Sequence, residues 1–142
     1  MIELKKHSIQ SIKDAYREIY ISVFGTWVEV GNCPADVYVG FEEEKYSGFL
    51  AGYPIGPGSW YLQSGGFINE SKKRIRNLRT FIQCLEILHE EWNYISTKVR
   101  NDDFPTLRIS LAAGFKIIGT EIDTDGNLWV QLIHLKEVIE NG

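Results

Sequence analysis

The sequence predicts a mixed α/β domain in which helices flank a largely antiparallel sheet. Three observations carry this prediction: a helical pattern precedes three strand-like runs, a second long helical pattern separates them from the next strand, and the chain closes on a hairpin. A length of 142 residues suits one domain, so we expect residues 1–142 to fold as a single unit. Apolar residues at 44% and charged residues at 24% fit a globular protein with an ordinary core.

The N-terminal part should contain one strand, one helix and a loop. Ile2–Leu4 is predicted to be a short strand. From Ile9 to Phe24 apolar residues recur every three or four positions, which indicates one buried helix face, and Gly25 would end this helix. Residues 25–36 contain glycine, asparagine and proline and are predicted to form a loop.

Three strand-like runs follow in the order of a meander. They are Val37–Phe41, Tyr46–Tyr53 and Ser59–Phe67. The first connection is a run of charged residues, and the second, residues 54–58, is rich in proline and glycine. Both connections have turn composition, so we expect two antiparallel hairpins.

A long helix should lead into a parallel strand. Apolar residues keep steps of three or four from Ile75 to Trp92, and Asn69 or Ser71 would cap the start of this helix. Asn93–Val99 then has the pattern of a strand. The order strand, helix, strand predicts a right-handed parallel crossover.

The chain should end with a short helix and a hairpin. Asp103 would cap a helix over Phe104–Ala113, which Gly114 ends. Lys116–Ile122 and Leu128–Leu135 are predicted to be the two strands of the hairpin, joined by a tight turn of aspartate, glycine and asparagine.

This order of elements, with a helix that stops at Gly114-Phe115 and a terminal hairpin, resembles the GCN5-related N-acetyltransferase (GNAT) superfamily. The resemblance covers nearly the whole chain as an order of elements and is most specific in sequence at Asn101–Gly119. It implies transfer of an acetyl group from acetyl-coenzyme A to a primary amine of a small molecule or a protein. It also implies that Trp60–Gly66 and Tyr94–Arg100 form the walls of the coenzyme site. Ser64-Gly65-Gly66 either forms the bulge that parts these walls or simply ends the strand.

The resemblance assigns coenzyme binding to the third meander strand, the start of the long helix and the segment before the last helix. The residues concerned are Gln63, Ser64, Gly65, Lys72, Lys73, Arg74, Arg76 and Asn101. The cations stand where free N–H groups and the helix dipole favour an anion, which suits the phosphates of coenzyme A. A solvated basic face, or a patch for nucleic acid or an acidic partner, is the alternative explanation.

Acetyl transfer needs a base for the amine proton and an acid for the leaving thiolate. The family often has a tyrosine four residues before the glycine of Gly-Phe, and Ser110 occupies that position here. Gln63 and Tyr61 are the further catalytic candidates, while a plain polar position on the last helix is the better explanation of Ser110. Weaker candidates for the base are Glu29, Tyr53 and His134.

A second hypothesis is a GNAT-shaped binding or structural protein without catalysis. In the family the phosphate-binding motif usually has the sequence Gln/Arg-x-x-Gly-x-Gly/Ala, where x is any residue. The corresponding segment Ser71–Arg79 has no glycine, a feature that also resembles small diverged members encoded by bacteriophages. The missing glycines and the missing tyrosine favour this hypothesis.

Charge and composition limit the partners and the compartment. The 15 Lys and Arg against 19 Asp and Glu give a net charge of −4, so bulk nucleic-acid binding is not expected. No apolar run is long enough for a membrane span and no signal peptide is recognisable, which predicts a cytoplasmic protein with Cys33 and Cys84 reduced. The cysteines and histidines have no metal-binding spacing. The resemblance also allows a homodimer, because the final strands of this fold often pair across two subunits.

Overall fold

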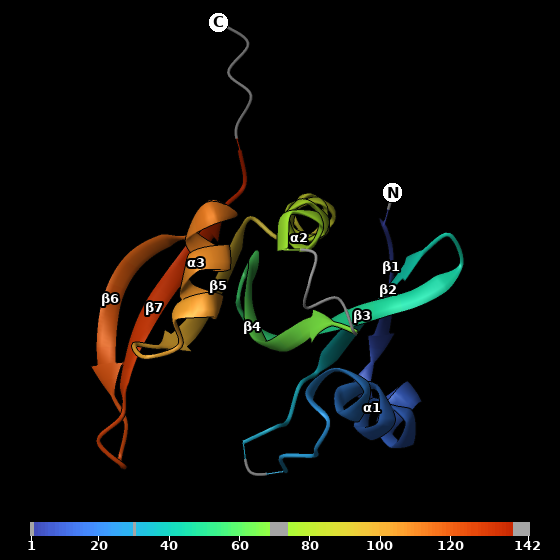
Figure 1. The fold of residues 1–142 in the computed structure, drawn as a ribbon, viewed down its shortest axis with the longest axis horizontal. Coiled ribbons are helices and arrows are strands. Elements are labelled where there is room, and N and C mark those ends of the chain that lie inside the picture. Colours follow the sequence, from blue (N-terminus) through green and yellow to red (C-terminus); the bar gives the residue numbers. More distant parts are fainter. Residues whose placement is uncertain (1, 30, 69–73, 138–142) are drawn as a thin grey trace, which may run out of the picture.

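The structure is a computed structural model that describes residues 2–29, 31–68 and 74–137, with the backbone alone at 74–76. In these ranges three helices flank one sheet of seven strands, whose spatial order is β1-β2-β3-β4-β5-β7-β6 (Figure 1). In chain order the elements are β1 (Ile2–Ser8), α1 (Ile9–Phe24), β2 (Asp36–Glu42), β3 (Lys45–Gly56), β4 (Ser59–Phe67), α2 (Arg74–Leu88), β5 (Tyr94–Arg100), α3 (Phe104–Ala112), β6 (Lys116–Ile122) and β7 (Leu128–Leu135).

The topology confirms the predicted mixed, largely antiparallel sheet. β4 and β5, which α2 connects, form the parallel pair, and every other neighbouring pair is antiparallel. β5 also separates the meander β1–β4 from the terminal hairpin β6–β7. The predicted crossover therefore lies at the centre of the sheet.

The helices cover opposite faces of the sheet. On one face, Tyr16 of α1 packs against Val37, Phe49 and Ala51, all buried. The opposite face carries the larger core, where α2 packs over the central strands. Ala113, which follows α3, belongs to the same core. The largest fully buried side chains of this core are Trp60, Leu85, Leu88, Ile95 and Leu132.

Several boundaries differ from the sequence-based expectation, and β3, for one, continues to Gly56, into residues predicted to form a turn. β1 continues to Ser8 rather than ending at Leu4, because its whole length pairs with β2. α2 ends at Leu88 rather than Trp92, since the N–H of Glu90 bonds three residues back instead of four. The periodicity of apolar residues reveals neither the pairing of β1 with β2 nor the tighter hydrogen bonding after Leu88.

The bulge in β4 lies at a different residue from the one predicted. Leu62 pairs with Gly52 and Ser64 with Ala51, so Gln63 is the extra residue. Gly65 and Gly66 instead pair regularly with β3. Glycine at these positions allows close packing, because a Cβ on Gly65 would lie 2.7 Å from a backbone oxygen of β3.

The start and the end of α3 follow the predicted signals. The carboxylate of Asp103 accepts a 3.3 Å hydrogen bond from the backbone N–H of Thr106, which caps the first turn. Gly114 has φ of 103°, a left-handed backbone that favours glycine. The chain can therefore turn directly from α3 into β6. No helix in the described ranges is both long and apolar enough to cross a membrane.

Candidate active site

The parallel ladder between β4 and β5 is short. It begins at the start of both strands and ends at the pair Tyr61 and Ser96. One residue later, the hydroxyl of Thr97 donates a 2.8 Å hydrogen bond to the backbone oxygen of Leu62, so a side chain replaces the main-chain bond. After this point the two strands no longer pair, and Figure 1 shows β4 curving away from β5.

The bulge at Gln63 stands at the same place and ties β4 to the loop after α1. The amide nitrogen of Gln63 donates to the backbone oxygen of Gly31, while its amide oxygen is buried without a hydrogen-bond partner in the described structure. Ser64 lies 3.4 Å from the hydroxyl of Tyr16, which donates a 2.8 Å bond to Asn32. The loop after α1 is therefore in contact with β4 at the point where the β4–β5 ladder ends.

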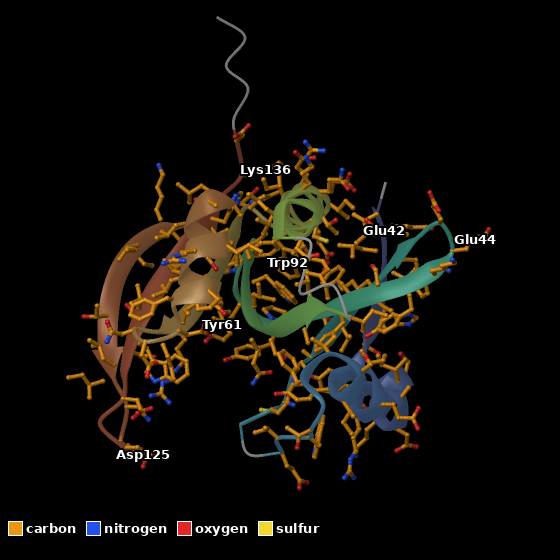
Figure 2. All side chains as sticks on the ribbon, viewed as in Figure 1. Glu42, Glu44, Tyr61, Trp92, Asp125 and Lys136 are labelled. Atoms are coloured by element: carbon orange, nitrogen blue, oxygen red, sulfur yellow. The ribbon has the colours of Figure 1, made fainter. Side chains whose placement is uncertain are left out.

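A cavity of about 370 Å³ lies beside the end of the ladder. Cross-strand partners such as Tyr53 and Tyr61, or Lys98 and Gln131, contribute to it from one face of the sheet. Figure 2 labels Tyr61 between β4 and the strands that lead to the terminal hairpin. The full lining is Tyr53, Tyr61, Ser96, Thr97, Lys98, Ile118, Glu121, Gln131 and Leu132.

The charges of this cavity form one ion pair. The ammonium of Lys98 lies 2.8 Å from the carboxylate of Glu121 and 4.9 Å from the ring centre of Trp129. Within the part of the chain that the structure describes, the hydroxyl of Ser96 is buried without a hydrogen-bond partner. An unpaired buried hydroxyl is costly, and a bound ligand would satisfy it.

The two tyrosines of the cavity lie close together, with ring centres 5.2 Å apart. Burial, and to a lesser extent Tyr53 and Glu121, raise the pKa of Tyr61 to about 12. The phenol of Tyr61 is therefore protonated at neutral pH. It can donate a hydrogen bond or a proton, but it cannot serve as a base.

The predicted site residues do not all lie at this cavity. Gln63, Ser64 and Tyr61 lie together where the ladder ends, and Gly65 follows on the same strand. Ser110 is 4% exposed on α3 and does not line this cavity.

Asn101 is exposed, and its backbone N–H donates a 3.0 Å bond to Leu128. Lys72 and Lys73 lie outside the described residues, as do Asn69 and Ser71, and α2 is described at Arg74 and Arg76 by its backbone alone. The roles assigned to all of these residues stay predictions.

Sequence reasoning placed Ser96 and Lys98 only within the expected wall Tyr94–Arg100 and missed the polar residues that β6 and β7 bring to the cavity. Those are Glu121 and Gln131. Alternation along each strand places Ser96 and Lys98 on one face, which was a usable signal. Their meeting with Glu121 depends on the register of the three strands, which alternation within a strand does not reveal.

No protein-family model and no curated protein matches the sequence. Solved structures match over nearly the whole chain. An aminoglycoside acetyltransferase in complex with coenzyme A has a TM-score of 0.67 at 16% identity, covering 96% of this chain and 95% of that chain.

Two further matches come from named organisms. The ribosomal-protein-S18-alanine N-acetyltransferase from Escherichia coli has a TM-score of 0.63 at 14% identity, covering 99% of this chain and 98% of that chain. A GNAT family acetyltransferase from Elizabethkingia anophelis, with acetyl-CoA bound, has a TM-score of 0.64 at 9% identity, covering 95% and 98%. The chain thus has the fold of the GNAT acetyltransferases, which confirms the predicted fold class and the resemblance at the level of the fold.

Proposed function

We propose that this protein is an N-acetyltransferase that moves an acetyl group from acetyl-CoA to a primary amine. The observation that carries the proposal is the coincidence of two features: the β4–β5 ladder stops at Tyr61 and Ser96, and a polar cavity lies over the same pair. Structures of the same fold are described as acetyltransferases holding coenzyme A or acetyl-CoA, which supports the choice of co-substrate.

The coenzyme would occupy the space between the parting strands. Its pantetheine arm carries two amides, which need hydrogen-bond partners of the kind that unpaired strand backbone offers. The phosphates would then lie near the start of α2, where the sequence concentrates Lys72, Lys73, Arg74 and Arg76. In this protein the positive side chains would bind the phosphates, whereas in the family glycines leave the backbone N–H groups free to do so.

The acceptor amine would enter the cavity over Tyr61. Its nitrogen attacks the acetyl carbonyl carbon, the carbon–sulfur bond breaks, and the products are an amide and the free thiol of coenzyme A. The 2.8 Å ion pair with Lys98 would hold the Glu121 carboxylate in place beside the amine. Glu121 would accept the amine proton, directly or through a water, and the phenol of Tyr61 would donate a hydrogen bond to the departing sulfur. The proton held by Glu121 would then pass through water to the thiolate, which leaves as the free thiol.

Coenzyme binding is tested by calorimetric titration with acetyl-CoA at low and moderate salt. We expect micromolar, salt-sensitive binding that weakens at least tenfold in Lys73→Glu/Arg74→Glu. The matched control is Lys13→Glu/Lys45→Glu, which makes the same change of charge at two exposed lysines on other elements. Absence of heat at millimolar acetyl-CoA would overturn the proposal, and equal weakening in both variants would remove the helix start from the site.

Catalysis is tested by release of the coenzyme thiol with a panel of small amines, aminosugars and peptides. General bases contribute about 10²–10⁴-fold to rate, so we expect Glu121→Gln to lower kcat at least 100-fold while its affinity for acetyl-CoA stays that of the wild type. Glu3→Gln, at an exposed carboxylate of β1, is the control. Unchanged turnover in Glu121→Gln would exclude Glu121 as the base.

A binding protein without catalysis is the second candidate function. Ser110 favours it, because a side chain only 4% exposed takes the place of the tyrosine that the family often uses as the acid. Calorimetric binding of acetyl-CoA without acetylation of any amine in the panel would select this candidate.

A further inference from the structure

Two histidines face each other on the side of the sheet opposite the candidate active site. His89 follows α2 directly, and His134 lies on β7 two residues after the buried Leu132, so that its side chain faces the same core. The Nε2 atom of His89 is 2.7 Å from the Nδ1 atom of His134. The rings line a cavity of about 310 Å³, and His89 is only 7% exposed.

The outer nitrogen of each ring contacts a backbone carbonyl. His89 Nδ1 lies 2.8 Å from the oxygen of Trp92, and His134 Nε2 lies 3.0 Å from the oxygen of Ala113. A carbonyl oxygen can only accept a hydrogen bond. Both outer nitrogens must therefore carry a hydrogen and donate it.

This assignment determines what lies between the rings. A neutral imidazole carries one N–H, so two neutral rings would direct two lone pairs at each other across 2.7 Å. One additional proton converts this repulsion into a charge-assisted N–H···N hydrogen bond. A second additional proton would place two N–H groups in the same space. The 2.7 Å contact between the inner nitrogens therefore fits one shared proton, and it fits neither an empty gap nor two protons.

The surroundings oppose a second positive charge on the pair. Burial, the largest influence, lowers the pKa of His134 and a charge on His89 lowers it further, whereas the bond to Ala113 and the carboxylate of Glu137 act in the opposite direction. A doubly charged pair is thus opposed. The charged groups that face this cavity are Glu86, Glu90, Lys136 and Glu137, and α3 contributes no charged side chain to its lining.

Gly114 of the Gly114-Phe115 pair packs closely against this arrangement. A Cβ on Gly114 would lie 3.2 Å from His134 Nε2, closer than most Cβ atoms come to a neighbour. Phe115 then covers His134 edge to face, with ring centres 5.1 Å apart. The histidine pair therefore joins the end of α2, strand β7 and the turn from α3 into β6.

We propose that His89 and His134 form a proton-binding site that holds one shared proton through neutral pH and fastens the end of α2 to β7 and to the α3–β6 turn. Gain or loss of a proton would release this contact. The proposal does not depend on the proposed acetyl transfer, because neither histidine lines the cavity over Tyr61.

The site has a defined effect on stability against pH. Two unfolded histidines, each with a pKa of about 6.5, together bind one proton near pH 6.5. Above that pH the folded pair holds more protons than the unfolded chain, so stability falls as pH rises. Below it the unfolded chain holds more protons, so stability falls as pH decreases. The contribution of the pair should therefore be largest near pH 6.5.

The direct test is nitrogen NMR of the imidazole rings in the wild-type protein at pH 7.5. We expect both outer nitrogens to be protonated and the inner pair to share a third, strongly downfield proton. Two neutral rings, with one outer nitrogen lacking its hydrogen, would overturn the proposal.

A second test needs no assignment of protons. In His134→Asn the side-chain amide can donate to a neutral His89 without an extra proton, and the unfolded variant still protonates His89 at low pH. The melting temperature of wild type minus variant should therefore be constant below about pH 6 and fall as pH rises through and above about 6.5. His7→Asn, on the edge strand β1, is the control and should give a difference curve without this fall. A wild-type minus His134→Asn difference that is flat between pH 5.5 and 8.5 would contradict the proposal.

Discussion

Gly52 provides the sharpest test of the packing around the bulge. It lies on β3 opposite Leu62, at the point where β4 gains its extra residue. A Cβ built on Gly52 would lie 1.9 Å from the backbone oxygen of Tyr61 and 2.9 Å from the ring of Trp60. Because one of these atoms is backbone and Trp60 is fully buried, neither can turn aside. We therefore expect Gly52→Ala to force β3 and β4 apart.

The magnitude follows from the size of that movement. The oxygen must withdraw by about 1 Å before it reaches even the shortest contact that real Cβ atoms make. Overpacking of this kind costs about 1–3 kcal/mol, and each strand hydrogen bond that is lost adds about 1 kcal/mol. A total of about 2–4 kcal/mol should lower the melting temperature by roughly 10 °C in a domain of this size.

The assay is thermal unfolding of the wild type, Gly52→Ala and a matched control. Gly56→Ala makes the same change on the same strand, where a Cβ would have nothing within 4 Å and the backbone is not left-handed. That variant should match the wild type or gain about 0.5 kcal/mol from the lower entropy of its unfolded chain. If Gly52→Ala melts within 2 °C of Gly56→Ala, the reasoning about the close approach is wrong.

Three further predictions concern the core, the terminal turn and the thiols. Leu132 is fully buried, so Leu132→Ala should cost about 2–5 kcal/mol in chemical unfolding. Hydrogen bonds, first among them that from Trp129, lower the pKa of Asp123 to about 2, so the stability deficit of Asp123→Asn should be complete above about pH 4 and vanish as pH falls toward 2, as followed by unfolding at each pH. Burial raises the pKa of the Cys84 thiol to about 12, so a thiol reagent at pH 8 should modify only the exposed Cys33 in the folded protein, and mass spectrometry should find no label in Cys33→Ser.

The sequence predicted most elements because their signals are local. Apolar periodicity identified α1 and α2, and a capping aspartate and a glycine marked both ends of α3. One boundary that failed depends on a distant partner: β1 continues to Ser8 only because β2 lies beside it. An isolated pattern cannot show how far a neighbouring strand extends.

The candidate site was predicted in part. Gln63, Ser64 and Tyr61 were expected beside the coenzyme, and they lie where the β4–β5 ladder ends. The bulge was placed at the glycines and is found at Gln63, because a bulge is a property of two paired strands and glycine also serves close approach. Glu121 was not predicted at all, since its strand is far from β4 in sequence.

The sequence by itself determined the order of elements, and through that order the GNAT fold. It also specified the left-handed turn at Gly114, where backbone geometry restricts the residue type. Only the tertiary structure decided which side chains meet: Tyr61 with Glu121 in one cavity, and His89 with His134, 45 residues apart, across the other. Such meetings depend on strand register and on the packing of helices over the sheet. No local pattern encodes them, because each partner is chosen by a contact that forms only when the whole sheet has assembled.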